Sequence, residues 1–349
     1  SIITLYEPIF LYTVLDFSVI QILLFMASVY ALYIVLIPFG GKIASRFGYA
    51  HAIFFSIPFQ ILFWFFLLGA EQNFYYIYLA PVVYAIQKSL LWPAFHASLA
   101  RFANSEQRGR EFSMLYAIMS VVQISGPMIG GFLSIMFGLN GLLIIASLIY
   151  LCSAIPLFWS KEVFVPKEYK FHDTWELYKT YPARFIGYFG FGEEILVQTI
   201  WPVFIFMIVS NFQDLGTLVT IATLAATGLA LYIGIYTDKH SKRTVLRIGA
   251  WFYILTWLAR IPVISPFGVF ITDALSRTSK SLVVIPMSTL TYERAESTHI
   301  MPYIVGFEQM LALGKLLACL VGIMVFAFTG SFMALFLVGA IFSLFYFLI

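Results

Sequence analysis

Residues 18–45 read SVIQILLFMASVYALYIVLIPFGGKIAS, and the stretch carries no charged side chain before Lys42. A helix that spans the hydrocarbon of a bilayer needs about 20 consecutive apolar residues, and this stretch exceeds that length. A helix that is apolar on all its faces must be buried, either in a large core or in a membrane. The stretch therefore predicts a membrane-spanning helix.

The remainder of the chain has the same character. Of its 349 residues, 61% are hydrophobic and 11% are charged, whereas soluble domains have roughly 45–50% and about 25%. A soluble protein must cover its surface with polar groups, so the composition excludes a soluble enzyme, a nucleic-acid-binding protein and a disordered scaffold. Cys152 and Cys319 both lie in apolar runs, and we interpret them as core residues without a disulfide or metal role.

Short polar breaks divide the chain into twelve apolar segments of helical length. An average of 349/12, or about 29 residues for a helix and its connection, leaves no room for a soluble domain. We predict an all-α, polytopic membrane protein with a trimmed chain at both ends and a truncated first helix. The expected helices are residues 1–14, 18–45, 50–68, 75–102, 110–137, 139–159, 184–209, 215–236, 245–264, 267–292, 300–328 and 332–349.

Basic residues lie in alternate connections between these segments. Fifteen of the 20 Lys and Arg residues lie in the connections that follow the even-numbered helices or at the adjoining helix ends, and no Lys or Arg lies in the other connections. Because cytoplasmic loops of membrane proteins are rich in Lys and Arg, the pattern predicts that both termini are cytoplasmic. We expect the longest polar break, residues 160–183, to be a cytoplasmic or interfacial tether.

The sequence also repeats itself. Residues 7–12 align with 201–206, residues 41–48 with 234–241, and residues 88–90 with 280–282, at offsets of 201−7 = 194, 234−41 = 193 and 280−88 = 192. The nearly constant offset predicts two pseudo-symmetric six-helix halves, residues 1–159 and 184–349, joined by the linker 160–183. Transporters built from such repeats bind substrate near the middle of the membrane, between the repeats.

At this point the loops resemble those of the major facilitator superfamily. The family's patterns are G-x-x-x-D-R-x-G after the second helix of each half and E-x-R-G before the fifth helix, and Ser45 replaces the Asp of the first pattern. The matching residues are Gly41, Arg46, Gly48, Arg108, Gly109, Gly234 and Asp238. The resemblance implies that these loops act in conformational switching, and that helices 1, 4, 7 and 10 line a cavity.

The fifth predicted helix contains Gly126, Pro127, Gly130 and Gly131, which resemble the superfamily's antiporter motif G-P-x-x-G-G. Val122 stands where the family has a further Gly. Glycines let helices approach closely, and Pro bends a helix. In the family this element is associated with proton-driven exporters, and the alternative is a packing role alone.

Ionisable residues inside the predicted spans mark the expected site, because a charge in hydrocarbon is costly and must face a cavity or a partner. Asp273, Arg277 and Lys280 share one helix face. A structural ion pair between Asp273 and Arg277 is the alternative to a binding role. The candidate substrate-binding residues are Lys88, Arg277, Lys280, Asp273, Lys315, Gln198, Trp201, Tyr84 and Trp92.

The carboxyl groups of the spans are candidates for proton coupling, in the order Glu194, Glu7, Glu308 and Glu193. Adjacent residues cannot face the same way, and we favour Glu194 over Glu193 because its helix face continues through Gln198. Glu7 and Glu194 have no basic neighbour on their own helices, and desolvation favours the neutral form of a carboxyl group. A hydrogen bond to the backbone loosened by Pro8 is the alternative for Glu7.

Two further features of the spans have two interpretations each. Gly187, Gly190 and Gly192 precede the adjacent glutamates, and a helical Gly costs about 1 kcal/mol relative to Ala. These glycines indicate either a gating hinge or a closely packed segment. His96 is either a structural residue or a proton relay.

Together these features predict a proton-coupled secondary active transporter that works by alternating access. We predict an antiporter that exports small amphipathic organic compounds, and the alternative is proton-coupled uptake of an organic anion held by Lys88, Arg277 and Lys280. A polytopic membrane transferase fits less well, because the connections on the outer side are short. A channel does not account as well for charges of both signs at mid-depth.

The same features indicate what should bind to the protein and where it should reside. We expect no enzymatic activity, no cofactor and no metal ion. The expected partners are a small-molecule substrate, protons and the lipid bilayer, with no nucleic acid. We expect a multi-pass monomer in a bacterial or archaeal cytoplasmic membrane.

Overall fold

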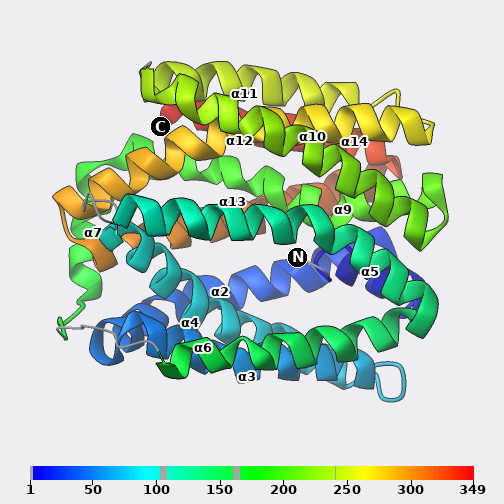
Figure 1. Ribbon diagram of the computed structural model, residues 1–349, viewed down its shortest axis with the longest axis horizontal. Coiled ribbons are helices and arrows are strands. Elements are labelled where there is room, and N and C mark those ends of the chain that lie inside the picture. Colours follow the sequence, from blue (N-terminus) through cyan, green and yellow to red (C-terminus); the bar gives the residue numbers. More distant parts are fainter. Residues whose placement is uncertain (1–2, 103–107, 160–165, 240) are drawn as a thin grey trace.

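The computed structural model describes residues 3–102, 108–159, 166–239 and 241–349, without the side chains of residues 102–120, 158–165 and 230–240. All regular elements in this part of the chain are helices (Figure 1). In chain order they are α1 (Glu7–Thr13), α2 (Val19–Phe47), α3 (Tyr49–Gly69), α4 (Tyr76–Phe102), α5 (Arg108–Cys152), α6 (Ala154–Trp159), α7 (Phe171–Thr180), α8 (Pro182–Gly187), the 3₁₀ helix η1 (Tyr188–Phe191), α9 (Gly192–Val209), α10 (Phe212–Lys239), α11 (Lys242–Ala259), α12 (Pro266–Ser297), α13 (Ile300–Thr329), α14 (Phe332–Ser343) and η2 (Leu344–Leu348).

The apolar stretch that begins near residue 18 forms α2. Its start is fixed by a capping box, in which the backbone N–H of Gln21 donates to Ser18 Oγ (3.3 Å) and the backbone N–H of Ser18 donates to Gln21 Oε1 (2.8 Å). This reciprocal pair satisfies two N–H groups that the helix itself leaves free. The helix is 29 residues long, which is enough to cross a bilayer.

Length and apolar composition qualify five helical stretches of the described residues as membrane spans: Val19–Phe47, Tyr49–Gly69, Val121–Leu157, Pro182–Val209 and Ile300–Thr329. Other long helices contain ionisable residues in their middle turns. Helix α12, for example, carries Asp273, Arg277 and Lys280. Such residues lower the hydropathy of a span while placing polar groups inside the protein.

The fifth and sixth predicted helices meet without a loop. Helix α5 covers both of them up to Cys152, and a single non-helical residue, Gly138 (φ 69°, ψ 175°), turns the chain between them. Gly adopts this positive φ without the steric cost that other residues have there. The short helix α6 then completes the sixth span.

The seventh predicted helix is broken into α8, η1 and α9 at its glycines. A Cβ at Gly187 would lie 2.6 Å from Ile349, one at Gly190 would lie 2.6 Å from Tyr346, and one at Gly192 would lie 2.3 Å from Phe342. These contacts leave no room for a side chain, so the glycines allow the last helix of the chain to approach closely. The geometry favours the packing interpretation over the hinge.

Helices from distant parts of the sequence lie side by side. In Figure 1, α2, α3, α4 and α6 occupy the lower part of the view, α10, α11, α12 and α14 occupy the upper part, and α13 lies between them. Helix α13 packs against both α2 and α9, α5 packs against α10, and α4 meets α12. At Gly40, where α2 meets α4, an added Cβ would lie only 1.8 Å from the carbonyl oxygen of Ser89.

The linker differs from the expected tether. Its described part contains α7, which packs against α13. Thr174 is fully buried and donates a hydrogen bond to the carbonyl oxygen of Pro302 (3.0 Å), and the Tyr178 hydroxyl donates to Gln309 Oε1 (2.8 Å). The tether interpretation was therefore wrong, because the linker's apolar and hydroxyl side chains anchor it to the transmembrane helices.

Candidate functional site

Two lysines and one glutamate meet in the interior, where α2, α4, α9 and α13 face one another. Lys315 Nζ of α13 lies 2.7 Å from Glu194 Oε2 of α9. The ring of Tyr30 from α2 is near both lysines, with its centroid 5.7 Å from Lys88 Nζ and 5.4 Å from Lys315 Nζ. Lys88 Nζ also lies 4.4 Å from the centroid of the Tyr84 ring on α4. We call Tyr30, Tyr84, Lys88, Glu194 and Lys315 the central cluster.

Lys88 differs from Lys280 and Lys315, the two lysines of the spans that pair with acids. Its side chain is 9% exposed, yet its Nζ has no acid partner or hydrogen-bond acceptor among the residues that the structure describes. Only aromatic faces hold it, and a cation–π contact with a desolvated ammonium group contributes about 2 kcal/mol. Glu7, Glu194 and Glu308 are near enough to act on Lys88 through their charge. The ammonium group is therefore available to an anionic ligand.

Glu194 and Glu193 point to different partners, as adjacent residues must. Glu193 is fully buried and binds Lys280 of α12, the Tyr253 hydroxyl and the Tyr346 hydroxyl, the last at 2.9 Å. Glu194 keeps 28% of its side chain exposed and faces the central cluster. As expected, Glu194 has no basic partner on its own helix. Its basic partner, Lys315, comes from α13.

Two charged residues of α12, Asp273 and Arg277, pair with each other. Arg277 Nε lies 2.7 Å from Asp273 Oδ2, and Trp201 donates its indole N–H to Asp273 Oδ1 (3.0 Å). Nearby, the guanidinium of Arg260 lies between the rings of Trp201 and Trp257, 4.4 and 4.1 Å from their centroids. Asp273 and Trp201 are buried, so these contacts take Asp273, Trp201 and Arg277 out of the central cluster.

Glu308 lies where four helices meet, toward the end of the bundle that holds α7. Tyr33 of α2 donates its hydroxyl to Glu308 Oε2 (2.7 Å), and His96 Nε2 of α4 lies 3.1 Å from Glu308 Oε1. His96 Nδ1 in turn lies 2.7 Å from the Tyr292 hydroxyl of α12, and Trp92 stacks on the imidazole at 5.6 Å. Glu308 and Lys315, which share one face of α13, thus bind different partners.

Glu7 is held by a residue that the sequence analysis did not single out. Trp64 of α3 donates its indole N–H to Glu7 Oε1 (2.7 Å), and both side chains are buried. This bond takes the place of the backbone contact considered for Glu7. A buried indole N–H needs a hydrogen-bond acceptor. Trp64, in an otherwise apolar segment, could therefore have indicated that a polar group such as Glu7 lies beside it.

The fifth-helix motif packs against α10. A Cβ at Gly131 would lie 2.5 Å from the carbonyl oxygen of Phe212, and one at Gly216 would lie 2.3 Å from that of Pro127. The Tyr6 hydroxyl donates to the Pro127 carbonyl oxygen at 2.6 Å. Gly126 and Gly130 are buried in the same helix.

The loop residues are described only in part. Gly41 meets Val305 of α13, where an added Cβ would lie 2.7 Å from Val305 Cγ2. Gly48 has a φ of 104°, which explains the need for glycine between α2 and α3. Arg46 is exposed at the end of α2. The side chains of Arg108, Gly109, Gly234 and Asp238 lie outside the described residues.

The helices around the central cluster differ from those that the resemblance implied. Helices 1, 4, 7 and 10 of the expectation correspond to α1, α4, α9 and α12, whereas the cluster draws its residues from α2, α4, α9 and α13. Lys280 lies with Glu193 instead, and Glu7 lies with Trp64. Gln198 is half-buried on α9. Interhelical packing therefore brings residues of helices 2 and 11 into this cluster.

A multi-pass helical fold with ionisable residues in its interior is typical of membrane transporters. The comparisons with known proteins give the class. The family model of the Major Facilitator Superfamily matches residues 1–213. This is more than half of the chain, and the chain belongs to this superfamily of secondary transporters. The expected superfamily, the all-helical fold and the multi-pass membrane location are thereby confirmed.

A solved structure of the same fold supports this assignment. The crystal structure of a mutant of the nucleoside transporter NupG matches with a TM-score of 0.70 and 13% identity, over 99% of this chain and 92% of that one. At this identity the likeness concerns the fold. No curated protein matches the chain in sequence.

We expect Lys280→Ala to destabilise the protein, because it leaves Glu193 buried without its cation. Breaking a buried ion pair by removing one partner typically costs about 3–5 kcal/mol. The measurement is the apparent melting temperature in detergent, and Lys280→Ala combined with Glu193→Gln should recover part of the loss. The control is Lys179→Ala, which removes an exposed lysine. An unchanged melting temperature with weakened substrate binding would instead place Lys280 in the substrate site.

Proposed function

We propose that the protein is a proton-coupled symporter of a small organic anion. The observation that carries this proposal is Lys88, a buried ammonium group that aromatic rings hold and that forms no ion pair with a described acid. Burying a cation without a counterion is costly, so an anionic ligand that pairs with it gains binding energy. Of the two alternatives that the sequence left open, this geometry favours the organic anion over an amphipathic compound for export.

The ion pair beside Lys88 supplies a mechanism for coupling. Lys315 lies within reach of Glu194 and shares the Tyr30 ring with Lys88. An anion that bridges Lys88 and Lys315 competes with Glu194 for Lys315. The displaced carboxylate then takes up a proton, which avoids an isolated negative charge beside the anion. Anion and proton would thus be bound together and released together.

Alternating access would expose the loaded cluster to one side at a time. We propose that residues 1–159 and 184–349 move as two halves, with both termini on the cytoplasmic side, as the distribution of basic residues indicates. The contacts of α2 with α13 and of α5 with α10 lie between these halves, and they would open in turn. Binding shifts such an equilibrium only through different affinities for the two states.

The test is proton uptake into vesicles that contain the purified protein and a pH-sensitive dye. Adding small carboxylates or organophosphates outside should acidify the lumen when the protein is present. Neutral nucleosides, the compounds for which the transporter NupG is named, and amphipathic cations should not do so. Alkalinisation on addition of an amphipathic cation would support export by antiport and overturn the proposal.

A further inference from the structure

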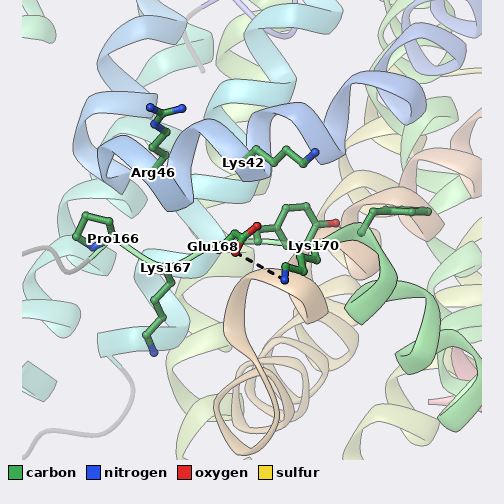
Figure 2. A pocket seen from close by; sticks show the side chains of 8 residues that line it. Lys42, Arg46, Pro166, Lys167, Glu168 and Lys170 are labelled. Atoms are coloured by element: carbon green, nitrogen blue, oxygen red, sulfur yellow. Dashed lines mark ion pairs between the residues drawn. The ribbon is translucent and has the colours of Figure 1, made fainter.

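A basic cavity lies at the end of α2, away from the central cluster. It has a volume of about 620 Å³, and its lining comes from two segments of the chain. Lys42 and Arg46 belong to the end of α2, and residues 166–171 form the chain that enters α7. Figure 2 shows Lys42 and Arg46 on their helix beside the segment that carries Lys167, Glu168 and Lys170.

The cavity carries an excess of positive charge. Its lining holds four cations, Lys42, Arg46, Lys167 and Lys170, and one acid, Glu168. Of these cations, only Lys170 has an acid partner among the described residues, at 3.7 Å. Both members of that pair are more than half exposed, so the pair is weak. The cavity is therefore suited to an anionic ligand.

Hydrogen bonds join the segment that lines the cavity to both α2 and α13. The Lys167 backbone N–H donates to the Ser45 carbonyl oxygen at the end of α2 (3.1 Å). On the other side, Tyr169 is buried, and its hydroxyl contacts Thr174 Oγ1 (2.9 Å), which donates to the Pro302 carbonyl oxygen of α13. Burial raises the pKa of Tyr169 to about 12, so this hydroxyl keeps its proton at physiological pH.

We infer that this cavity binds the phosphate group of an organophosphate, and that the bound ligand holds α2, the linker and α13 together. Phosphate is a natural partner of Lys and Arg side chains. The volume exceeds that of inorganic phosphate and leaves space for an attached glycerol or sugar group. Because the cavity opens at the end of α2 that the basic residues assign to the cytoplasm, a lipid headgroup or a soluble metabolite could supply this chemistry.

Occupancy of the cavity would control the opening of one side of the protein. A ligand that binds only while α2, the linker and α13 are in contact stabilises that arrangement by mass action. Transport requires α2 and α13 to separate at this end, so the ligand should slow turnover without touching the central cluster. This inference goes beyond the substrate assignment and stands if that assignment fails.

The first test measures ligand-dependent thermal stability of the full chain in detergent. The probes are dihexanoyl phosphatidylglycerol, glycerol 3-phosphate and inorganic phosphate, with dihexanoyl phosphatidylcholine as the zwitterionic control. We expect the first two to raise the melting temperature. A shift with phosphatidylglycerol alone identifies a lipid headgroup. An equal or larger shift with glycerol 3-phosphate that persists in Lys88→Ala identifies a soluble ligand of this cavity. No shift with either of them overturns the inference.

The second test removes the charge of the cavity. Lys42→Ala with Lys167→Ala should weaken binding of the effective probe about tenfold or more, since each basic residue near a surface contributes modestly to anion binding. Lys42→Arg with Lys167→Arg should retain it, and this pair controls for folding. The matched control is Lys179→Ala, an exposed lysine of α7 outside the cavity lining. An unchanged affinity in the double Ala variant would place the ligand elsewhere.

Discussion

Glu194→Gln should abolish proton-driven accumulation of substrate while leaving substrate exchange intact. The glutamine is nearly isosteric with a protonated glutamate, but it cannot bind and release a proton. It also leaves Lys315 without the carboxylate that lies 2.7 Å away in the structure. Lys315 should then be permanently available to the anion, so binding should persist and lose most of its pH dependence.

The measurement is substrate accumulation in vesicles with an imposed pH gradient, followed by counterflow without a gradient. We expect accumulation to fall to the level of equilibration, a loss of about tenfold or more, while counterflow stays near the wild-type rate. Glu176→Gln serves as the matched control, because Glu176 is an exposed glutamate whose pKa is lowered by its hydrogen bond to Lys179. If Glu194→Gln accumulates substrate as the wild type does, Glu7→Gln and Glu308→Gln become the next variants to test.

Lys88→Ala should weaken substrate binding more than any other single change in the central cluster. A hydrogen bond to a charged group contributes about 1.5–3 kcal/mol, which corresponds to a loss of about 10- to 150-fold in affinity. The protein should remain folded, because Lys88 forms no ion pair with an acid among the described residues, so its removal breaks none. Its melting temperature without ligand should therefore stay close to that of the wild type.

The measurement is the concentration dependence of the thermal shift produced by the anion that acidifies vesicles. Lys88→Arg should retain part of the affinity, since it keeps the charge but changes the geometry of the donor. Lys179→Ala again provides a lysine removal outside the site. An affinity for the anion that is the same in Lys88→Ala and in the wild type would contradict the assignment of Lys88, and with it the anion symport proposal.

Sequence alone established the class of the protein and much of its helical order. The apolar runs predicted a multi-pass all-helical fold, and the loop residues around Gly41 and Gly48 indicated the superfamily. The spacing of Asp273 and Arg277 suggested, as one of two interpretations, the ion pair that the structure contains. These features are local, because a span is set by its own composition and an i, i+4 pair is set by the helix that carries it.

The packing of the linker could not be predicted from its own sequence. Residues 160–183 have the composition of a polar tether, yet Thr174 and Tyr178 of α7 bond to Pro302 and Gln309 of α13. A short amphipathic segment has no fixed partner in its own sequence. Its docking depends on acceptors that another helix presents, and these are known only when the helices are packed.

The composition of the site also depended on tertiary structure. No spacing along α9 could reveal that Glu194 pairs with Lys315 or that Glu193 pairs with Lys280. No spacing along α4 could reveal that the described contacts of Lys88 Nζ are with aromatic rings. In a span that is apolar on all faces, periodicity does not fix how the helix is rotated about its axis. That rotation is set by the close contacts between helices, such as those at Gly40, Gly192 and Gly131. Sequence therefore determined which charges lie in the membrane, and only packing between helices decided which of them pair with an opposite charge.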